Sequence, residues 1–137
     1  MPGNTFPIFT KRGQIGMIPN LTLANVARDG TGVVDVLVAA DATNGGFLRK
    51  IVVQPRGTNV ATVLRFFVNN GGATTVAANN VLFRELSMPA TTATEIAAVQ
   101  GNEIPINDML PIGHRIIVTM GTAVAGGIAI SAWAGDY

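Results

Sequence analysis

Turn residues recur throughout this 137-residue sequence, and their spacing limits the possible fold more than any other feature. Asn, Asp and Gly supply the positive-φ positions of tight turns. Such clusters lie at 28–30, 44–46, 55–57, 69–72 and 101–102. The segments between them are rich in Val, Ile, Leu and Phe, and none keeps a helical period of 3.6 with proper caps. The pattern predicts an all-β chain of short strands.

The clearest predicted strand runs from Val60 to Asn69. Both of its alternating faces are largely apolar, so we expect a central strand, with Arg65 reaching an edge or a partner. Asn70-Gly71-Gly72 then turns the chain, and a second strand is predicted over about 80–88. Glu85 in that strand is expected to pair with a cross-strand Arg or Lys.

The remaining apolar runs predict two hairpins and one further strand. One hairpin joins 33–39 to 47–54, and the other joins 114–120 to 128–133. The further strand lies near 16–23. The segment 94–106 is compatible with one or two short strands or with a helical turn at 94–99. The total of roughly seven to nine strands predicts an antiparallel β-sandwich, with a jelly roll as the expected arrangement.

The first part of the chain has a different character. Pro2, Pro7 and Gly13 are interspersed with apolar side chains, which indicates an extended N-terminal arm at 1–16 followed by a single sandwich domain at 17–137. Apolar side chains on an exposed arm usually dock onto another chain. An arm folded back over its own sandwich is the alternative.

Composition excludes several classes of function. Charged residues make up 12% of the chain, against about 25% in typical domains. The formal charge of +1 removes the electrostatic case for nucleic acid or an anionic membrane as partner. No apolar run reaches the ~20 residues of a membrane helix, and no signal peptide is visible. A neutral polar surface suits permanent contact with other proteins, although a stable or secreted monomer is the alternative.

Little in the sequence supports catalysis. The chain has no Cys and a single His, and its carboxylates are scattered singly. We therefore expect no enzyme, no metal site and no cofactor. His114 is expected at the start of a strand with a satisfied hydrogen bond, and Arg28-Asp29-Gly30 is expected to form a turn in which Asp29 caps its own backbone. Trp133 and Tyr137 could form a sugar-binding surface, but a core Trp with a packed terminus is the favoured interpretation.

Three stretches resemble small structural proteins of tailed-bacteriophage heads. They are 23–32 (LANVARDGTG), 79–92 (NNVLFRELSMPATT) and 121–137 (GTAVAGGIAISAWAGDY). The resemblance implies a capsid decoration, or cement, protein built as a β-sandwich on the outer surface of the virion. It further implies a homotrimer that bridges subunits of the major capsid protein, made in the host cytoplasm.

Two sets of residues are candidates for these contacts. The apolar arm predicts capsid contacts through Phe6, Ile8, Phe9, Lys11 and Arg12. The C-terminal strand, which carries few charges, predicts oligomer contacts through Ile128, Ile130, Trp133 and Tyr137. The alternatives are another virion component, such as a tail, neck, head-fibre or spike base, and a carbohydrate-binding β-sandwich.

Overall fold

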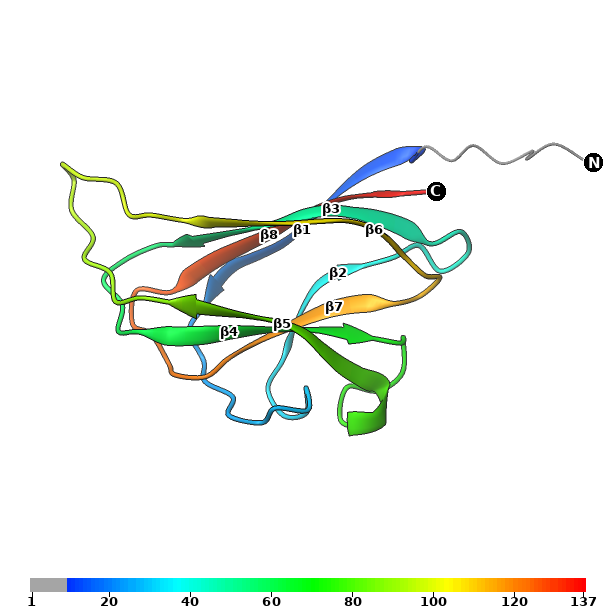
Figure 1. Cartoon of the computed structure of the whole chain (residues 1–137), viewed down its shortest axis with the longest axis horizontal. Coiled ribbons are helices and arrows are strands. Elements are labelled where there is room, and N and C mark those ends of the chain that lie inside the picture. Colours follow the sequence, from blue (N-terminus) through cyan, green and yellow to red (C-terminus); the bar gives the residue numbers. More distant parts are fainter. Residues whose placement is uncertain (1–9) are drawn as a thin grey trace, which may run out of the picture.

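The computed structural model describes residues 10–137, which form a sandwich of two four-stranded antiparallel sheets (Figure 1). The strands are β1 Arg12–Leu21, β2 Asp35–Ala39, β3 Gly46–Pro55, β4 Thr62–Asn69, β5 Asn80–Met88, β6 Asn102–Leu110, β7 Arg115–Met120 and β8 Ile128–Asp136. A single 3-10 turn, η1 Ala77–Asn79, precedes β5. The predicted all-β sandwich is confirmed.

The strands pair in a nested order. The first sheet, here called sheet A, has the order β1-β8-β3-β6, and the second, sheet B, has the order β2-β7-β4-β5. First therefore pairs with eighth, second with seventh, third with sixth and fourth with fifth. The start of β1 and the end of β8 consequently lie at the same end of the sandwich (Figure 1).

The predicted strands over 60–69 and 80–88 are confirmed with small shifts, and they form the hairpin β4–β5. As expected, β4 is central in its sheet, between β7 and β5. The ambiguous segment resolves into irregular chain up to Gly101 and a single strand, β6, after it.

Both of the other predicted hairpins are wrong. β2 lies in sheet B and β3 in sheet A, and β7 and β8 are divided in the same way. Each of these two connections carries the chain from one sheet to the other. In β2 the consecutive residues Leu37 and Val38 are both buried, whereas in β8 the alternation of 128–133 reflects burial against the core between the sheets. That alternation is the same whether the next strand pairs beside it or packs across from it, so it could not identify the partner.

β1 begins at Arg12, within the segment expected to be an arm. Gln14 and Gly16 pair with β8 as regularly as the rest of the strand, and the Lys11 amide already donates to the carbonyl of Asp136 (2.7 Å). The sandwich therefore includes residues 12–16. The earlier part of the expected arm, with Phe6, Ile8 and Phe9, lies outside the described residues.

The core fills the space between the sheets. Its members are apolar side chains that are almost completely shielded from solvent, among them Leu37, Ile51, Val53, Leu64, Phe66, Ile116, Val118, Ile128, Ile130 and Ala132. Burying one such large side chain stabilises a fold by about 1.5–3 kcal/mol.

The outer face of sheet B is covered by the chain itself. Phe67 and Ile117 are fully buried, although they point away from the core between the sheets. The β1–β2 connection, residues 22–34, lies on this side, below β4, β5 and β7 in Figure 1. It is held by hydrogen bonds from the Asn25 amide to the carbonyl of Met120 (2.6 Å) and from Asn80 to the carbonyl of Asp29 (3.1 Å).

Candidate interaction surfaces

His114, the residue considered for catalysis, lies directly before the first residue of β7 and contacts the backbone. His114 contacts the carbonyl of Ile112 through Nδ1 (3.2 Å), as expected for a histidine at a strand end. Within residues 10–137, no group of three His, Asp or Glu side chains is placed to hold a metal ion. A general base needs an orienting or reacting partner within hydrogen-bond reach. The contact described for the His114 ring is to a backbone carbonyl.

Two aspartates shape turns. As predicted, Asp29 caps its own turn, accepting from the amide and the hydroxyl of Thr31 (3.0 and 2.6 Å). Asp41 accepts from the amides of Thr43 and Asn44 (2.8 Å each) in the β2–β3 turn. These hydrogen bonds favour the charged carboxylates and lower the pKa of both Asp29 and Asp41. Both groups act locally on the backbone.

Arg65 and Glu85 form the expected cross-strand pair between β4 and β5. Arg65 Nε donates to Glu85 Oε1 (3.0 Å), and the Arg65 side chain is only 6% exposed. Arg28, from the 22–34 connection, donates to the same oxygen (3.0 Å). Glu85 therefore joins both sheet B and its covering loop.

The proposed capsid-contact residues Lys11 and Arg12 lie where the described chain enters β1. Arg12 Nη2 bonds Asp136 Oδ2 at 2.7 Å, and this contact raises the pKa of the Arg12 guanidinium. Asp136 is buried and Arg12 is largely exposed. Arg12 thus fastens the first residue of β1 to the last residue of β8, a role that sequence reasoning missed.

The proposed oligomer-contact residues divide into two groups. Ile128 and Ile130 are buried in the core of one chain, so they present no surface to a second copy. Trp133 is 44% exposed and Tyr137 is partly exposed. The favoured interpretation of Trp133 as a core residue is wrong. The alternation along β8 could have predicted this exposure. Ile128, Ile130 and Ala132 are even-numbered and share the inward face, so the odd-numbered Trp133 lies on the outward face.

Trp133 lies on an apolar outer face of sheet A. In register, Ile15 of β1 is beside it on one side and Lys50 of β3 on the other. Ile15 and Met17 are exposed on β1, and Met109 on β6 is exposed opposite Phe47. Residues 22–34 cover the opposite side of the sandwich and do not cover this face.

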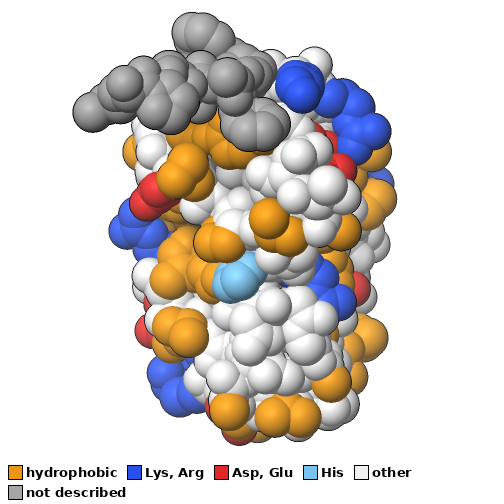
Figure 2. Space-filling view, turned by 90° about the vertical axis from the view of Figure 1, so that its right-hand side faces the viewer, with side chains coloured by type: hydrophobic (Ala, Val, Ile, Leu, Met, Phe, Trp, Pro, Cys, Tyr) orange, Lys and Arg blue, Asp and Glu red, His pale blue; other side chains and the backbone are white. Residues whose placement is uncertain are grey.

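Sheet A carries few charged side chains on this side: Lys50 and Glu103 pair with each other, and Arg49 is also exposed on β3. Lys50 Nζ lies 5.6 Å from the centre of the Trp133 ring and 3.3 Å from Glu103 Oε1. Trp133 Nε1 donates to the hydroxyl of Ser131 (3.2 Å). Figure 2 shows a different side of the molecule, the end of the sandwich that carries the single His; hydrophobic and uncharged groups surround this His, and basic side chains lie beside it and near the rim.

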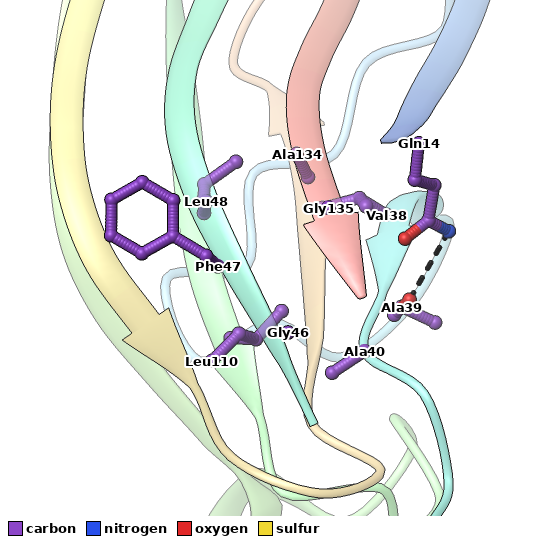
Figure 3. A pocket seen from close by; sticks show the side chains of 10 residues that line it. All are labelled: Gln14, Val38, Ala39, Ala40, Gly46, Phe47, Leu48, Leu110, Ala134 and Gly135. Atoms are coloured by element: carbon purple, nitrogen blue, oxygen red, sulfur yellow. Dashed lines mark hydrogen bonds between the residues drawn. The ribbon is translucent and has the colours of Figure 1, made fainter. Parts of the chain in front are cut away.

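A small apolar pocket lies between the sheets near the beginning of β1 (Figure 3). Phe47, Leu48 and Leu110 line one side, and the Gln14 side chain crosses the other to donate to the carbonyl of Ala39 (3.3 Å). Its volume is about 10 Å³, which is at the lower limit for a single water. The pocket is a packing gap rather than a ligand site.

Comparisons with known proteins give no family assignment. No family model matches the chain, and no curated protein matches it. Solved structures of infectious bursal disease virus align with it. A mutant VP2 from derived T=1 particles aligns with a TM-score of 0.36 and 14% identity over 96% of this chain. The Gx strain aligns with a TM-score of 0.33 and 12% identity over 98%.

These alignments are too weak to carry an argument about function. The chain spans only 36% and 35% of the length of the two viral chains. The class that the structure itself defines is an eight-stranded antiparallel β-sandwich. In the described part of the chain, no helix is long and apolar enough to cross a membrane.

Proposed function

We propose that this chain is a non-enzymatic structural protein of a virion, specifically a decoration or cement protein on the outside of a tailed-bacteriophage head. The observation that carries the proposal is the group of exposed apolar side chains on the outer face of sheet A, namely Ile15, Met17, Met109 and Trp133. An exposed apolar face of this kind marks contact with another protein. The resemblance of 23–32, 79–92 and 121–137 to phage-head proteins gives the proposal its viral context.

The strand order adds support. Nested pairing of eight strands in two sheets is the arrangement expected of a jelly roll, which we infer for this sandwich. Jelly rolls occur in viral capsid domains but also in lectins and cupins, so the fold alone does not select a function.

In the proposed mechanism, the protein bridges neighbouring subunits of the major capsid protein. A standard interface buries about 1,600 Å². Many copies acting at the seams of one shell give avidity far beyond a single contact. The shell then resists internal pressure because separating two subunits also requires breaking the bridge.

The N-terminal segment is proposed to contribute capsid contacts through Phe6, Ile8 and Phe9. The test is deletion of residues 1–9, which keeps Lys11 and Arg12 in their contacts with Asp136. The truncated protein should keep its far-ultraviolet circular dichroism and lose co-sedimentation with expanded heads that lack the protein. Unchanged co-sedimentation would refute the arm as the binding element.

The oligomer is proposed to be a homotrimer that uses Trp133 and Tyr137. Light scattering during size-exclusion chromatography should give a mass near three times 14.2 kDa. Trp133→Ala should reduce that mass while the chain stays folded, because the ring lies outside the core. A monomeric wild-type chain at high concentration would contradict self-association in solution.

Carbohydrate binding is a second candidate, because Trp133 is exposed beside the polar side chains of Ser131 and Lys50. A sugar could stack on the indole only if Lys50 moved from the ring face. A glycan array with wild-type protein and Trp133→Ala separates the two functions. Binding that Trp133→Ala abolishes would favour the sugar module, whereas head binding without glycan binding favours the cement protein. A tail, neck, head-fibre or spike base would bind those assemblies instead of head shells.

A further inference from the structure

β5 is an unusual edge strand. Within residues 10–137 it pairs only with β4, so the main-chain groups along its other side have no strand partner in this part of the chain (Figure 1). Three consecutive apolar side chains on it are exposed: Val81 at 64%, Leu82 at 37% and Phe83 at 37%. A long edge that combines unpaired main chain with exposed apolar side chains is a template for adding another strand.

The other three edges are blunted by devices known to prevent such pairing. β1 contains Pro19 and a register shift, and Gly16 packs so closely on Leu37 that β1 closes against β2. β2 has only five residues. β6 contains Pro105 and has Asn107 in the left-handed region, with φ of 52°. β5 has nine residues and no proline, although a register shift interrupts its pairing with β4 near Phe83.

The charged residues of β5 indicate which kind of strand could pair with its free edge. Glu85 is already bound by Arg65 and Arg28. Arg84 is exposed, and within residues 10–137 it has no ion pair or hydrogen bond from its side chain. An incoming strand with apolar side chains and a carboxylate near Arg84 would gain main-chain hydrogen bonds and a cross-strand ion pair.

A second copy of β5 is a poor partner for this edge. Antiparallel pairing of the full strand with itself about a two-fold axis would place Arg84 directly opposite Arg84, because it is the central residue of Asn80–Met88. Like charges directly opposite each other destabilise a strand pair. The N-terminal residues 1–11 contain no carboxylate and include two prolines, so they also fit poorly.

We propose that the β5 edge accepts an extended, carboxylate-bearing segment of the capsid subunit, which extends sheet B by one strand. This inference rests on the proposed function, since it takes the partner chain to be the capsid protein. It adds a further contact, separate from the N-terminal segment and from the face around Trp133. The affinity comes from main-chain hydrogen bonds, and the selectivity comes from Arg84 and from the exposed apolar side chains of Val81, Leu82 and Phe83.

The test compares charged substitutions on and off the edge. Val81→Lys places a charge on the edge as natural edge strands do, and Arg84→Glu reverses the charge that the partner strand would meet. Ile96→Lys is the matched control, because Ile96 is 96% exposed and lies in the irregular chain before β6. Both edge positions are exposed, so folding should survive, and thermal denaturation checks this point.

Binding to expanded, undecorated heads and amide hydrogen exchange are measured for each protein. We expect at least a tenfold loss of affinity for Val81→Lys and Arg84→Glu, no change for Ile96→Lys, and slower exchange of β5 amides in the bound wild-type protein. Wild-type binding with unprotected β5 amides, or with full affinity in both edge variants, would overturn the edge proposal and leave the cement function standing. Failure of the wild-type protein to bind heads would overturn both.

Discussion

Replacing Glu85 by alanine tests whether the buried Arg65 depends on its carboxylate partner. Arg65 is 6% exposed at its side chain and donates through Nε to Glu85 Oε1, while its Nη1 is buried without a hydrogen-bond partner. Removing Glu85 leaves a guanidinium that is shielded from water and has lost its ion pair. Glu85→Ala should therefore lower the free energy of unfolding markedly.

The magnitude follows from burial. Breaking a fully buried ion pair costs about 3–5 kcal/mol, and a hydrogen bond to a charged group contributes about 1.5–3 kcal/mol. Glu85 is 40% exposed, so water partly screens the pair and the lower range applies. We expect a loss of about 2 kcal/mol for Glu85→Ala. Arg28→Ala removes a partner that is 69% exposed and should cost less than about 1 kcal/mol.

Urea denaturation followed by Trp133 fluorescence and far-ultraviolet circular dichroism measures both variants. A loss of about 2 kcal/mol should also lower Tm by roughly 5–10 °C in a domain of this size. Glu85→Gln, which keeps an oxygen acceptor, should fall between wild type and Glu85→Ala. The reasoning would be refuted if Glu85→Ala lowered the free energy of unfolding no more than Arg28→Ala does. The buried Arg65 would then not depend on its carboxylate partner.

Three further predictions concern packing, pH and the core. Gly16→Ala should destabilise the fold by about 1–3 kcal/mol, because the new Cβ would overlap the carbonyl of Leu37. Gly13→Ala is the control, since its Cβ meets nothing within 4 Å and should not destabilise the fold. Equal denaturation midpoints for the two variants would contradict the close packing of β1 on β2. The pKa of Asp41 is lowered in the folded chain, so its charged form stabilises the fold above its ordinary pKa, and this contribution is lost as the pH falls through the lowered value. The difference in Tm between wild type and Asp41→Asn should therefore shrink from about pH 6 towards about pH 2, and a constant difference would disprove the assignment. Ile130→Ala should cost about 2–5 kcal/mol in urea denaturation, unlike Trp133→Ala, because only Ile130 lies in the core.

Local pattern in the sequence was enough for much of the secondary structure. The two apolar faces of 60–69 predicted a central strand, and β4 occupies that position. The place of Glu85 within a strand predicted its pairing with a cross-strand Arg or Lys, and the partner is Arg65; the Asp29 turn formed as expected. These features depend on residues that are close in sequence or on alternation along one strand, so tertiary context changes them little.

The candidate surfaces needed the assembled structure. Apolar character alone did not separate Ile130, which is buried in the core, from Trp133, which is exposed on the opposite face of the same strand. Nothing in 22–34 predicted that this segment would cover sheet B rather than the outer face of sheet A. The exposure of Val81 to Phe83 likewise follows from the place of β5 at the edge of its sheet.

The sequence by itself determined that the chain folds into short antiparallel strands with few charges and one His. Only the tertiary structure decided which strands share a sheet, which side chains of β8 face outward and which edge remains unpaired. The physical reason is that strand alternation has a local period of two residues, whereas the nested pairing joins residues as distant as Arg12 and Asp136. Which strands pair depends on how all of them together bury the core, and this cannot be predicted from any single segment of the sequence.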